Sequence, residues 1–345
     1  MKNQKIIFIG PSGGGGIPTN GASAKNYHLL KYLNAKGYTI TVVDTEHWKK
    51  NPIILIKLFF LLIFYPSGYY IISTNNISGY KLFKIFNIHK GKKRTLVYWV
   101  IGGSIAEWIK DSKVDIKPYR NINWFIVEGR KMKDTLCDCG LNNVIVVPNF
   151  KNFSIDIKKT EKANKNFMFL FISRIIPQKG VDMIFKAASS LSSDYRFNID
   201  FYGPVEDSYK EEFFIQIAQH PNTCYKGFID LRDEENYNKL AQYDVMLFPT
   251  FWEGEGFPGV IIDSYIAGLP VIASRWNLNE ELIENNKTGW LIEPKDTEAL
   301  IKTMEYVITH RSEVVNVSNN CLNKADAFRI ENVVTSELLS QIGLC

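Results

Sequence analysis

The stretch from Val245 to Ser274, VMLFPTFWEGEGFPGVIIDSYIAGLPVIAS, contains a complete strand–loop–helix–strand pattern. Asp244–Pro249 and Leu269–Ser274 are short apolar runs typical of buried strands. Between them, the glycine-rich loop Thr250–Gly259 leads into an apolar helical segment that ends near Ala267. Two parallel strands joined by a helix form a βαβ unit, so this stretch predicts an α/β fold with a parallel sheet.

The same alternation of strands and helices continues outward from this stretch in two series. The expected strands are Lys5–Ile9, Tyr38–Asp44, Tyr69–Ser73, Thr95–Val100, Trp124–Val127 and Val144–Val147, then Phe167–Ser173, Phe197–Tyr202 and the two strands above. The expected helices include Ala22–Lys36 with Gly37 as its C-cap, Gly180–Leu191, Tyr209–Gln219 and Glu234–Tyr243. A linker-like segment, Pro148–Thr160, separates the two series. We therefore predict two Rossmann-like domains, 1–153 and 154–345, with a cleft between their sheets, and leave open whether the last helix crosses back.

Composition is that of a globular protein, with 46% hydrophobic and 22% charged residues. The five cysteines are scattered and odd in number, which favours a reducing cytoplasm over a disulfide scaffold. No signal-peptide pattern opens the sequence. The most apolar segment, Pro52–Tyr65, has 14 residues, fewer than the roughly 20 that cross a bilayer. We expect it either to be buried against the sheet or to contact a membrane surface.

Charge is distributed unevenly along the chain. Residues 1–153 contain 22 Lys/Arg and 8 Asp/Glu, a net charge of +14, whereas the remainder has a net charge of −9. Such an imbalance favours an anionic partner for the first half. Nucleic acid and anionic lipid both fit, as does a simple surplus of solvated lysines. No nucleic-acid-binding module is recognisable, so we expect no nucleic-acid partner.

Three loops between a strand and a helix are candidates for binding chemistry. The first, Gly10–Gly21 (GPSGGGGIPTNG), would let backbone amides approach an anion at a helix N-terminus. It lacks the Gly-Lys-Ser/Thr ending of a P-loop and the spacing of a dinucleotide fingerprint. Asp44 nevertheless lies where a ribose-binding acid would follow in a dehydrogenase, so a nicotinamide-dependent oxidoreductase is an alternative.

The second loop follows the expected strand Phe167–Ser173. Arg174 closes this strand and Lys179 opens the next helix, five residues further on. A guanidinium fork and an ammonium at the carboxyl end of a strand can clamp a diphosphate.

The third loop is the one between the strands of the opening stretch. Its candidate residues are Glu255, Gly256, Phe257, Pro258 and Gly259, followed by Asp263 in the helix. Glu255 and Asp263 are too far apart along the chain to share a proton, and they suit two ends of one elongated ligand. Glu253, in the same loop, has the simpler interpretation of an acid stabilised by the helix dipole.

Together these loops resemble the retaining glycosyltransferases of family 4, which have the two-domain GT-B fold. The strongest resemblance is Glu255-Gly-Phe-Pro…Asp263-Ser-Tyr-Ile-Ala-Gly-Leu-Pro-Val-Ile, which is similar to the E-x7-E signature and the run that follows it. The other matching segments are Val147-Pro148-Asn149-Phe150, Ser173-Arg174…Lys179-Gly180, Tyr243-Asp244-Val245…Phe248-Pro249 and Asn286-Lys287-Thr288-Gly289-Trp290-Leu291. They occur in the family's order over nearly the whole chain.

The resemblance implies a role for each candidate residue. Arg174 and Lys179 would neutralise the leaving diphosphate, Glu255 would lie near the donor sugar, and Asp263 would hold the ribose. The amides of Gly256–Gly259 would also meet the donor. The base would lie near Gly203 and Phe228, and the loop of Gly13, Gly14, Gly15 and Gly16 would close over phosphate and acceptor. The resemblance implies no cofactor beyond the nucleotide sugar, and the absence of an Asp-x-Asp motif predicts metal independence.

Two positions depart from the family pattern. Asp263 stands where the family usually has Glu, and none of the five histidines falls in the loop Tyr98–Ser104, where many relatives carry one. We assign no general base, and a non-catalytic nucleotide-sugar- or lipid-binding homologue is a second alternative. The main prediction is a cytoplasmic transferase, peripheral on the inner face of the membrane. It moves a sugar from a nucleotide sugar, UDP favoured, to a saccharide or lipid-linked saccharide of a bacterial surface polysaccharide such as capsule or O-antigen.

Overall fold

The computed structural model describes residues 5–13, 21–46, 48, 53–64, 68–88, 94–157 and 166–344. The chain divides into two compact units. Unit 1 comprises residues 1–152 together with the C-terminal residues 328–345, and unit 2 comprises residues 153–327. The chain therefore returns to unit 1 after it has completed unit 2.

Unit 1 is built on a six-stranded parallel sheet with the order β2-β1-β3-β4-β5-β6. Its strands are β1 (Lys5–Gly10), β2 (Thr39–Asp44), β3 (Tyr69–Thr74), β4 (Thr95–Val100), β5 (Trp124–Val127) and β6 (Val144–Val146). The central strand β3 is buried along its whole length, as expected for a sheet covered on both faces. All six strand predictions are confirmed to within a residue or two.

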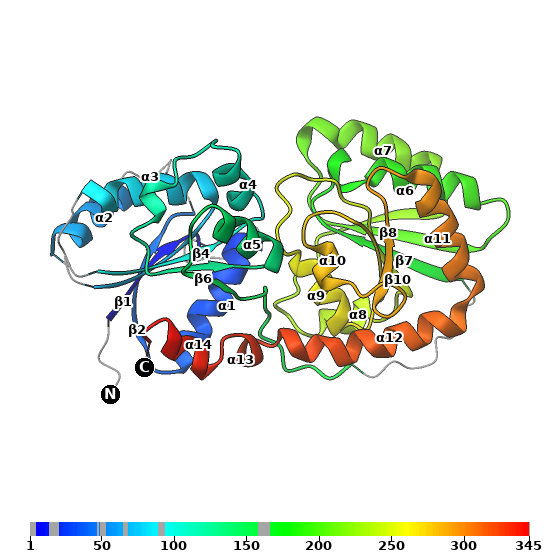
Figure 1. Ribbon diagram of the computed structural model, residues 1–345. Helices are drawn as coiled ribbons and strands as arrows, with labels where there is room; N and C mark the ends of the chain where they lie inside the picture. Colours follow the sequence, from blue (N-terminus) through cyan, green and yellow to red (C-terminus); the bar gives the residue numbers. More distant parts are fainter. Residues whose placement is uncertain are drawn as a thin grey trace. The chain divides into compact units, whose positions relative to one another are not determined.

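Helices cover both faces of this sheet. They are α1 (Gly21–Ala35), α2 (Ile53–Phe64), α3 (Asn76–Ile88), α4 (Ile105–Lys110), α5 (Arg130–Asp138), α13 (Ile330–Val333) and α14 (Ser336–Gln341). Helix α1 ends at Ala35, and Gly37 just beyond it has a positive φ of 85°, which confirms it as the capping glycine. Figure 1 shows α1, α13 and α14 on one face of the sheet, with α2 and α3 on the other.

Three tyrosine hydroxyls fasten the returning C-terminal segment to unit 1. Tyr69 donates to the carbonyl of Ile342 at 2.6 Å, Tyr38 to that of Leu344, and Tyr32 to that of Val334. Leucine and isoleucine side chains of α13 and α14 complete the same hydrophobic core as α1 and the strands. Burial of these apolar groups makes the last 18 residues part of unit 1.

Unit 2 repeats the architecture with the sheet order β12-β11-β10-β7-β8-β9, again all parallel. Its strands are β7 (Phe167–Ile172), β8 (Phe197–Tyr202), β9 (Thr223–Gly227), β10 (Val245–Phe248), β11 (Val271–Ser274) and β12 (Gly289–Ile292). The two edge strands, β9 and β12, are not among the predicted strands.

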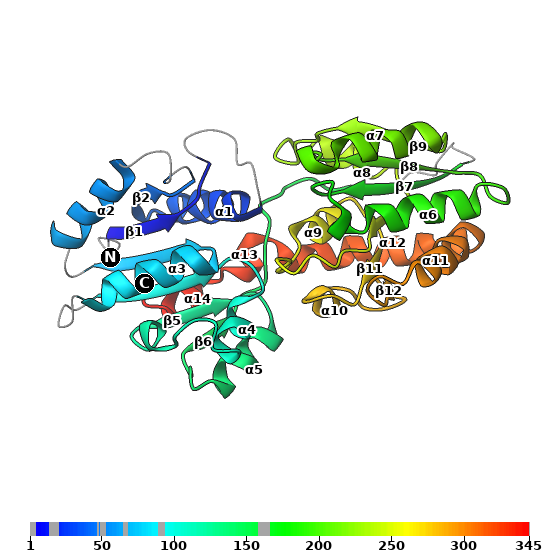
Figure 2. The ribbon, with the colours of Figure 1, turned by 90° about the horizontal axis from the view of Figure 1, so that it is seen from above.

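The helices of unit 2 are α6 (Val181–Leu191), α7 (Lys210–Gln219), α8 (Asn236–Leu240), α9 (Gly259–Ile266), α10 (Asn279–Leu282), α11 (Thr297–Thr309) and α12 (Arg311–Ala325). Helices α6 and α11 pack together, while α9 packs against α8 and α12 (Figures 1 and 2). The helix predicted at Glu234–Tyr243 is shorter than expected, because only its centre is helical.

The apolar segment predicted at Pro52–Tyr65 forms helix α2. Leu58 and Leu61 are buried, whereas Ile53, Ile56 and Phe60 are more than half exposed. The helix is therefore neither wholly buried nor wholly on the surface. Within the described parts of the chain, no helix is both long enough and apolar enough to cross a membrane.

The imidazole of His28 in α1 predicts a pH dependence for the stability of unit 1. Burial, with Lys151 and Lys31 nearby, lowers the pKa of His28 to about 3. Its Nδ1 is buried without a hydrogen-bond partner. The pKa of a histidine in the unfolded chain is near 6.5. Between pH 6.5 and 3 the unfolded chain therefore binds a proton at His28, whereas the folded chain does not.

The free energy of unfolding should consequently fall as the pH drops from about 6.5 toward 3, by about 2–3 kcal/mol at pH 4.5. Urea titrations between pH 7 and 4.5 measure this slope. A His28→Gln variant should flatten it, whereas His310→Gln on an exposed turn should not. An unchanged slope in His28→Gln would show that His28 does not cause this pH dependence.

Candidate donor site

The carboxyl ends of the parallel strands of unit 2 place the predicted loops along one edge of the sheet. Strand β7 leads into Ser173–Lys179, β10 into Thr250–Gly259, and β11 into Arg275–Asn277. Ligands of open α/β sheets bind at this edge. The two loops singled out on charge are thus neighbours, because β7 and β10 are adjacent strands.

Lys179 and Glu255 meet directly, although 76 positions separate them in the sequence. Lys179 ends the short 3-10 helix η2 (Pro177–Lys179), and its Nζ donates to Oε2 of Glu255. The side chains are 8% and 12% exposed. The ammonium also lies 5.2 Å from the centroid of the Phe248 ring, and Thr250 Oγ1 donates to the same carboxylate oxygen at 3.2 Å.

Arg174 lies at the same edge but has a different neighbour. Its guanidinium is 5.0 Å from the ring centroid of Trp252, and the side chain is exposed. Stacking on an aromatic face orients a guanidinium without using its hydrogen-bond donors. Arg174 therefore presents donors to solvent beside the Lys179–Glu255 pair.

Two glycines allow the backbone to pass close to its neighbours here. Gly180 has φ of 76°, and a Cβ at this position would lie 2.3 Å from the carbonyl oxygen of Pro249. Gly203, after β8, has φ of 135°, and a Cβ there would lie 1.8 Å from the carbonyl oxygen of Ser173. Neither position tolerates a side chain. Both glycines hold the strand-end loops against one another.

The loop of Glu255 is fixed by hydrogen bonds from the segment after β11. Trp276 Nε1 donates to the carbonyl of Trp252 at 2.7 Å, and Asn277 Nδ2 donates to the carbonyl of Glu255 at 2.8 Å. Phe257 and Pro258 are buried, and Gly259 begins α9. Glu253 is exposed. The structure thus separates the two acids of the loop: Glu255 points inward and Glu253 does not.

Asp263 lies in α9 and is only 5% exposed. Its Oδ1 accepts a 2.6 Å hydrogen bond from the hydroxyl of Tyr237 in α8. Burial and the neighbouring carboxylate raise the pKa of Tyr237, so this hydroxyl remains a donor. The sequence did not identify Tyr237, because a single tyrosine in a polar helix gives no signal for a partner 26 positions away.

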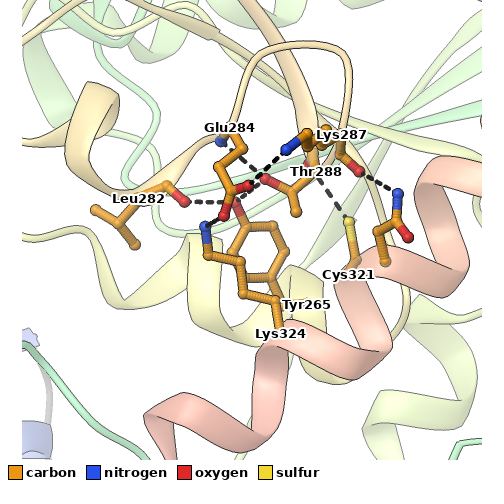
Figure 3. Close-up of polar contacts among 8 residues, drawn as sticks. Tyr265, Leu282, Glu284, Lys287, Thr288, Cys321 and Lys324 are labelled. Atoms are coloured by element: carbon orange, nitrogen blue, oxygen red, sulfur yellow. Dashed lines mark hydrogen bonds and ion pairs between the residues drawn. The ribbon is translucent and has the colours of Figure 1, made fainter.

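The segment Asn286–Leu291 contacts α9 through the side chain of Tyr265 (Figure 3). The hydroxyl of Tyr265 in α9 lies 3.0 Å from Thr288 Oγ1 and 3.2 Å from the carbonyl of Leu282. Glu284 pairs with Lys324 of α12 at 2.7 Å, and Cys321 Sγ donates to the carbonyl of Thr288. The segment therefore anchors the helix that carries Asp263.

The remaining predicted donor residues lie at the β8 and β9 ends of the same edge. Phe228, which directly follows β9, is 70% exposed. Tyr225 OH donates to the carbonyl of Gly203 at 3.0 Å, and the Gly203 amide donates to Gly227. An exposed ring beside fixed backbone is a suitable surface on which a planar base can stack.

The predicted glycine loop of unit 1 is described only as far as Gly13; Gly14, Gly15 and Gly16 lie outside the described residues. Ser12 donates to Asp44 through both its hydroxyl, at 2.6 Å, and its amide. The Gly13 amide donates to Glu46 Oε2 at 3.3 Å. The first amides of the loop thus already face carboxylates.

A further polar group at the carboxyl edge of the unit 1 sheet was not found from the sequence. Lys25 in α1 and Glu128 after β5 form a 2.6 Å ion pair whose side chains are 3% and 4% exposed. Asn76 at the start of α3 donates to Ser104 Oγ, before α4, at 2.8 Å. Of these four residues, only Ser104 lies in Tyr98–Ser104, the loop in which the family resemblance led us to look for a histidine. Within the described ranges, no group of three acidic, histidine or cysteine side chains could hold a metal ion.

Solved structures with this architecture define the fold class. Anabaena HepE, in complex with UDP, aligns over 98% of this chain and all of its own, with a TM-score of 0.74 and 18% identity. Sucrose-phosphate synthase from Thermosynechococcus elongatus aligns over 98% and 99%, with a TM-score of 0.77 and 14% identity. The predicted GT-B fold, two Rossmann-like units with parallel sheets, is confirmed.

The family follows from the sequence of unit 2. The model of the glycosyl transferases group 1 matches residues 152–324, just over half of the chain, and the protein belongs to this family. Staphylococcus aureus CapM, a capsular polysaccharide biosynthesis glycosyltransferase, is 25% identical over 61% of this chain and 54% of its own. Escherichia coli UDP-Gal:α-D-GlcNAc-diphosphoundecaprenol α-1,3-galactosyltransferase is 28% identical over 52% and 49%. The chain spans about half the length of the curated relatives it matches.

Proposed function

We propose that this protein transfers a sugar from a nucleoside diphosphate sugar to a saccharide acceptor in the synthesis of a bacterial surface polysaccharide. The observation that carries the proposal is the Lys179–Glu255 pair, with Arg174 beside it, at the carboxyl edge of the unit 2 sheet. Family membership supports the reaction class. The capsular polysaccharide and the lipid-linked acceptor named for two relatives support the pathway class. UDP is the favoured nucleotide, since the galactosyltransferase is named for UDP-Gal and HepE was solved in complex with UDP.

In the proposed reaction, charge stabilisation is the main task of the protein. An acceptor hydroxyl oxygen forms a bond to the anomeric carbon of the sugar and releases its proton, while the bond between that carbon and the diphosphate breaks. Negative charge accumulates on the departing diphosphate, which takes up the proton. Arg174 and Lys179 would neutralise this charge, because fixed cations at a partly dehydrated site stabilise a developing anion without reorganisation. Gly256, Phe257, Pro258 and Gly259 would supply backbone contacts to the donor.

The Lys179–Glu255 ion pair carries no net charge of its own. A diphosphate carries more charge than a carboxylate, so we infer that it takes over the ammonium on binding. Glu255 would then turn toward the donor sugar, where its carboxylate accepts hydrogen bonds from hydroxyls. Binding of the donor and release of Glu255 from Lys179 would therefore occur together.

Asp263 is proposed to act together with Tyr237 at the ribose end of the donor. Its carboxylate would accept from a ribose hydroxyl, while Tyr237 orients the carboxylate through Oδ1. The tyrosine would thus orient an acid that is one methylene shorter than the family's usual glutamate. Retention of configuration and independence of metal ions are further parts of the proposal that rest on the resemblance to family 4.

The acceptor is proposed to be lipid-linked, and the protein peripheral on the inner face of the membrane. Two curated relatives are named for acceptors attached to undecaprenol through a diphosphate. The net positive charge of residues 1–153 fits such anionic substrates at a membrane.

A panel of nucleotides tests the proposed reaction class. Thermal shifts should appear with UDP or another nucleoside diphosphate and its sugars, but not with NAD or NADP. The ligand that shifts the melting temperature should then support transfer of labelled sugar to a lipid-linked acceptor. A shift with nicotinamide cofactors alone would point to an oxidoreductase, and donor binding without hydrolysis or transfer would point to a non-catalytic homologue.

A further inference from the structure

Helices α2 and α3 of unit 1 expose an unusual share of the apolar side chains. Eleven large hydrophobic residues are exposed in the described parts of the chain, and six of them lie on these two helices. They are Ile53, Ile56, Phe59, Phe60, Ile77 and Ile85, between 40% and 67% exposed. Exposed apolar side chains concentrated on one pair of helices mark an interaction surface. We call these six residues the apolar face.

The apolar face of α2 is distinct from the side that packs on the sheet. Ile53, Ile56 and Phe60 follow one another at helical spacing and face outward, whereas Leu58 and Leu61 are buried. Apart from Lys57, every residue of α2 is apolar, and such a helix needs an apolar environment on more than one side. The sheet covers only one side of it.

An apolar cavity of about 160 Å³ opens between the two helices. Val43 and Thr74 line it from the sheet, Ile54 and Leu58 from α2, and Leu82 and Ile85 from α3, with Trp48, Thr45, Ser78 and Lys81 completing the wall. A dry cavity of about this volume binds a benzene-sized guest in an engineered protein. The cavity therefore has room for the end of one hydrocarbon chain.

The charged side chains of α2 and α3 have one sign. On α3, the exposed Lys81 and Lys84 alternate with Ile77 and Ile85 at helical spacing, and Lys57 lies among the exposed residues of α2. Between Glu46 and Glu107 the sequence has nine Lys/Arg and no acidic residue. The surface of an anionic membrane has phosphates on the outside and hydrocarbon beneath them. An apolar surface bordered by lysines complements both layers.

We propose that the apolar face binds the surface of an anionic phospholipid membrane, with one acyl chain end in the α2–α3 cavity. The exposed rings of Phe59 and Phe60 enter the acyl boundary, and Lys81 and Lys84 meet lipid phosphates. A second copy of the chain is a poorer occupant, since a two-fold contact would bring the same lysines of both copies together. The inference specifies the membrane contact of the proposed peripheral location, but does not depend on sugar transfer.

Vesicle flotation tests this binding. The full chain should float with vesicles that contain phosphatidylglycerol and remain unbound with pure phosphatidylcholine. Phe59→Ser/Phe60→Ser and Lys81→Gln/Lys84→Gln should each weaken binding at least about tenfold. The matched controls on unit 2, Phe214→Ser/Ile215→Ser on α7 and Lys210→Gln/Lys239→Gln, should bind as the wild type does.

The position of the acyl chain is tested with phosphatidylglycerol brominated along its chains. Trp48 lines the cavity, so the bromines should quench part of the tryptophan emission, and that part should vanish in Trp48→Phe. Quenching that is equal in both proteins would exclude a chain in the cavity. Absence of flotation with anionic vesicles at low salt, equal loss in the unit 2 controls, or concentration-dependent dimers abolished by Phe59→Ser/Phe60→Ser would each overturn the proposal.

The same variants separate this inference from the proposed function. Phe59→Ser/Phe60→Ser should keep donor hydrolysis and transfer to a water-soluble acceptor. Flotation without any transfer would disprove the enzyme and leave the membrane surface intact. Transfer without flotation would disprove the membrane surface and leave the proposed enzyme intact.

Discussion

Replacement of Lys179 by alanine is expected to lower kcat/KM for sugar transfer by about 100- to 1,000-fold. The Lys179 side chain is only 8% exposed and its ammonium forms an ion pair with Glu255, so no solvent cation can take its place at a bound diphosphate. Initial rates with the donor identified by the nucleotide panel measure the loss. Because the loss concerns the leaving group, kcat should fall more than KM rises.

Lys186→Ala provides the matched control, because this lysine is exposed on α6 in the same unit. It should retain the wild-type rate. Circular dichroism should show that Lys179→Ala is folded. A folded Lys179→Ala protein with more than about a third of the wild-type activity would contradict the site.

Replacement of Lys25 by methionine is expected to destabilise unit 1 by about 3–5 kcal/mol, because it leaves the Glu128 carboxylate buried beside an apolar side chain. Both side chains are less than 5% exposed, and Lys25 Nζ lies 5.8 Å from the centroid of the Phe150 ring. Urea denaturation followed by circular dichroism measures the change in the free energy of unfolding.

Two further variants define what the buried pair contributes. The double variant Lys25→Met/Glu128→Leu should recover much of the loss, since an apolar pair of similar volume needs no charge partner. Lys113→Met breaks the exposed pair with Asp111, whose side chains are 61% and 47% exposed, and should change stability by less than about 1 kcal/mol. Equal effects of Lys25→Met and Lys113→Met would show that burial of the pair is unimportant.

The sequence predicted the fold well where strands are buried on both faces. Central strands such as Tyr69–Thr74 and Phe167–Ile172 are continuous apolar runs, which only a covered parallel sheet explains. The edge strands Thr223–Gly227 and Gly289–Ile292 were missed. Thr223–Gly227 is short and half-exposed, so TCYKG carries no apolar run to recognise it by. Gly289–Ile292 is mostly buried, but its four residues, GWLI, are too few to show a period.

The sequence predicted that the candidate residues lie along one edge of the sheet, but it did not predict their contacts. Arg174, Lys179 and Glu255 could be assigned to one edge, because strand order follows from βαβ rules and loops follow strand ends. That Lys179 reaches Glu255 rather than solvent depends on side-chain directions across two adjacent strands, which no local pattern encodes. The partners Tyr237 for Asp263 and Glu128 for Lys25 were missed for the same reason.

Calorimetric titration of UDP and GDP into the wild type and Lys179→Ala tests the central claim most directly, because it needs neither acceptor nor sugar. We expect saturable binding of a nucleoside diphosphate to the wild type, and binding at least about tenfold weaker to Lys179→Ala. Lys186→Ala should bind as the wild type does. Binding of equal strength to Lys179→Ala, or no binding of either nucleotide to the wild type, would contradict a donor site at this edge of the sheet.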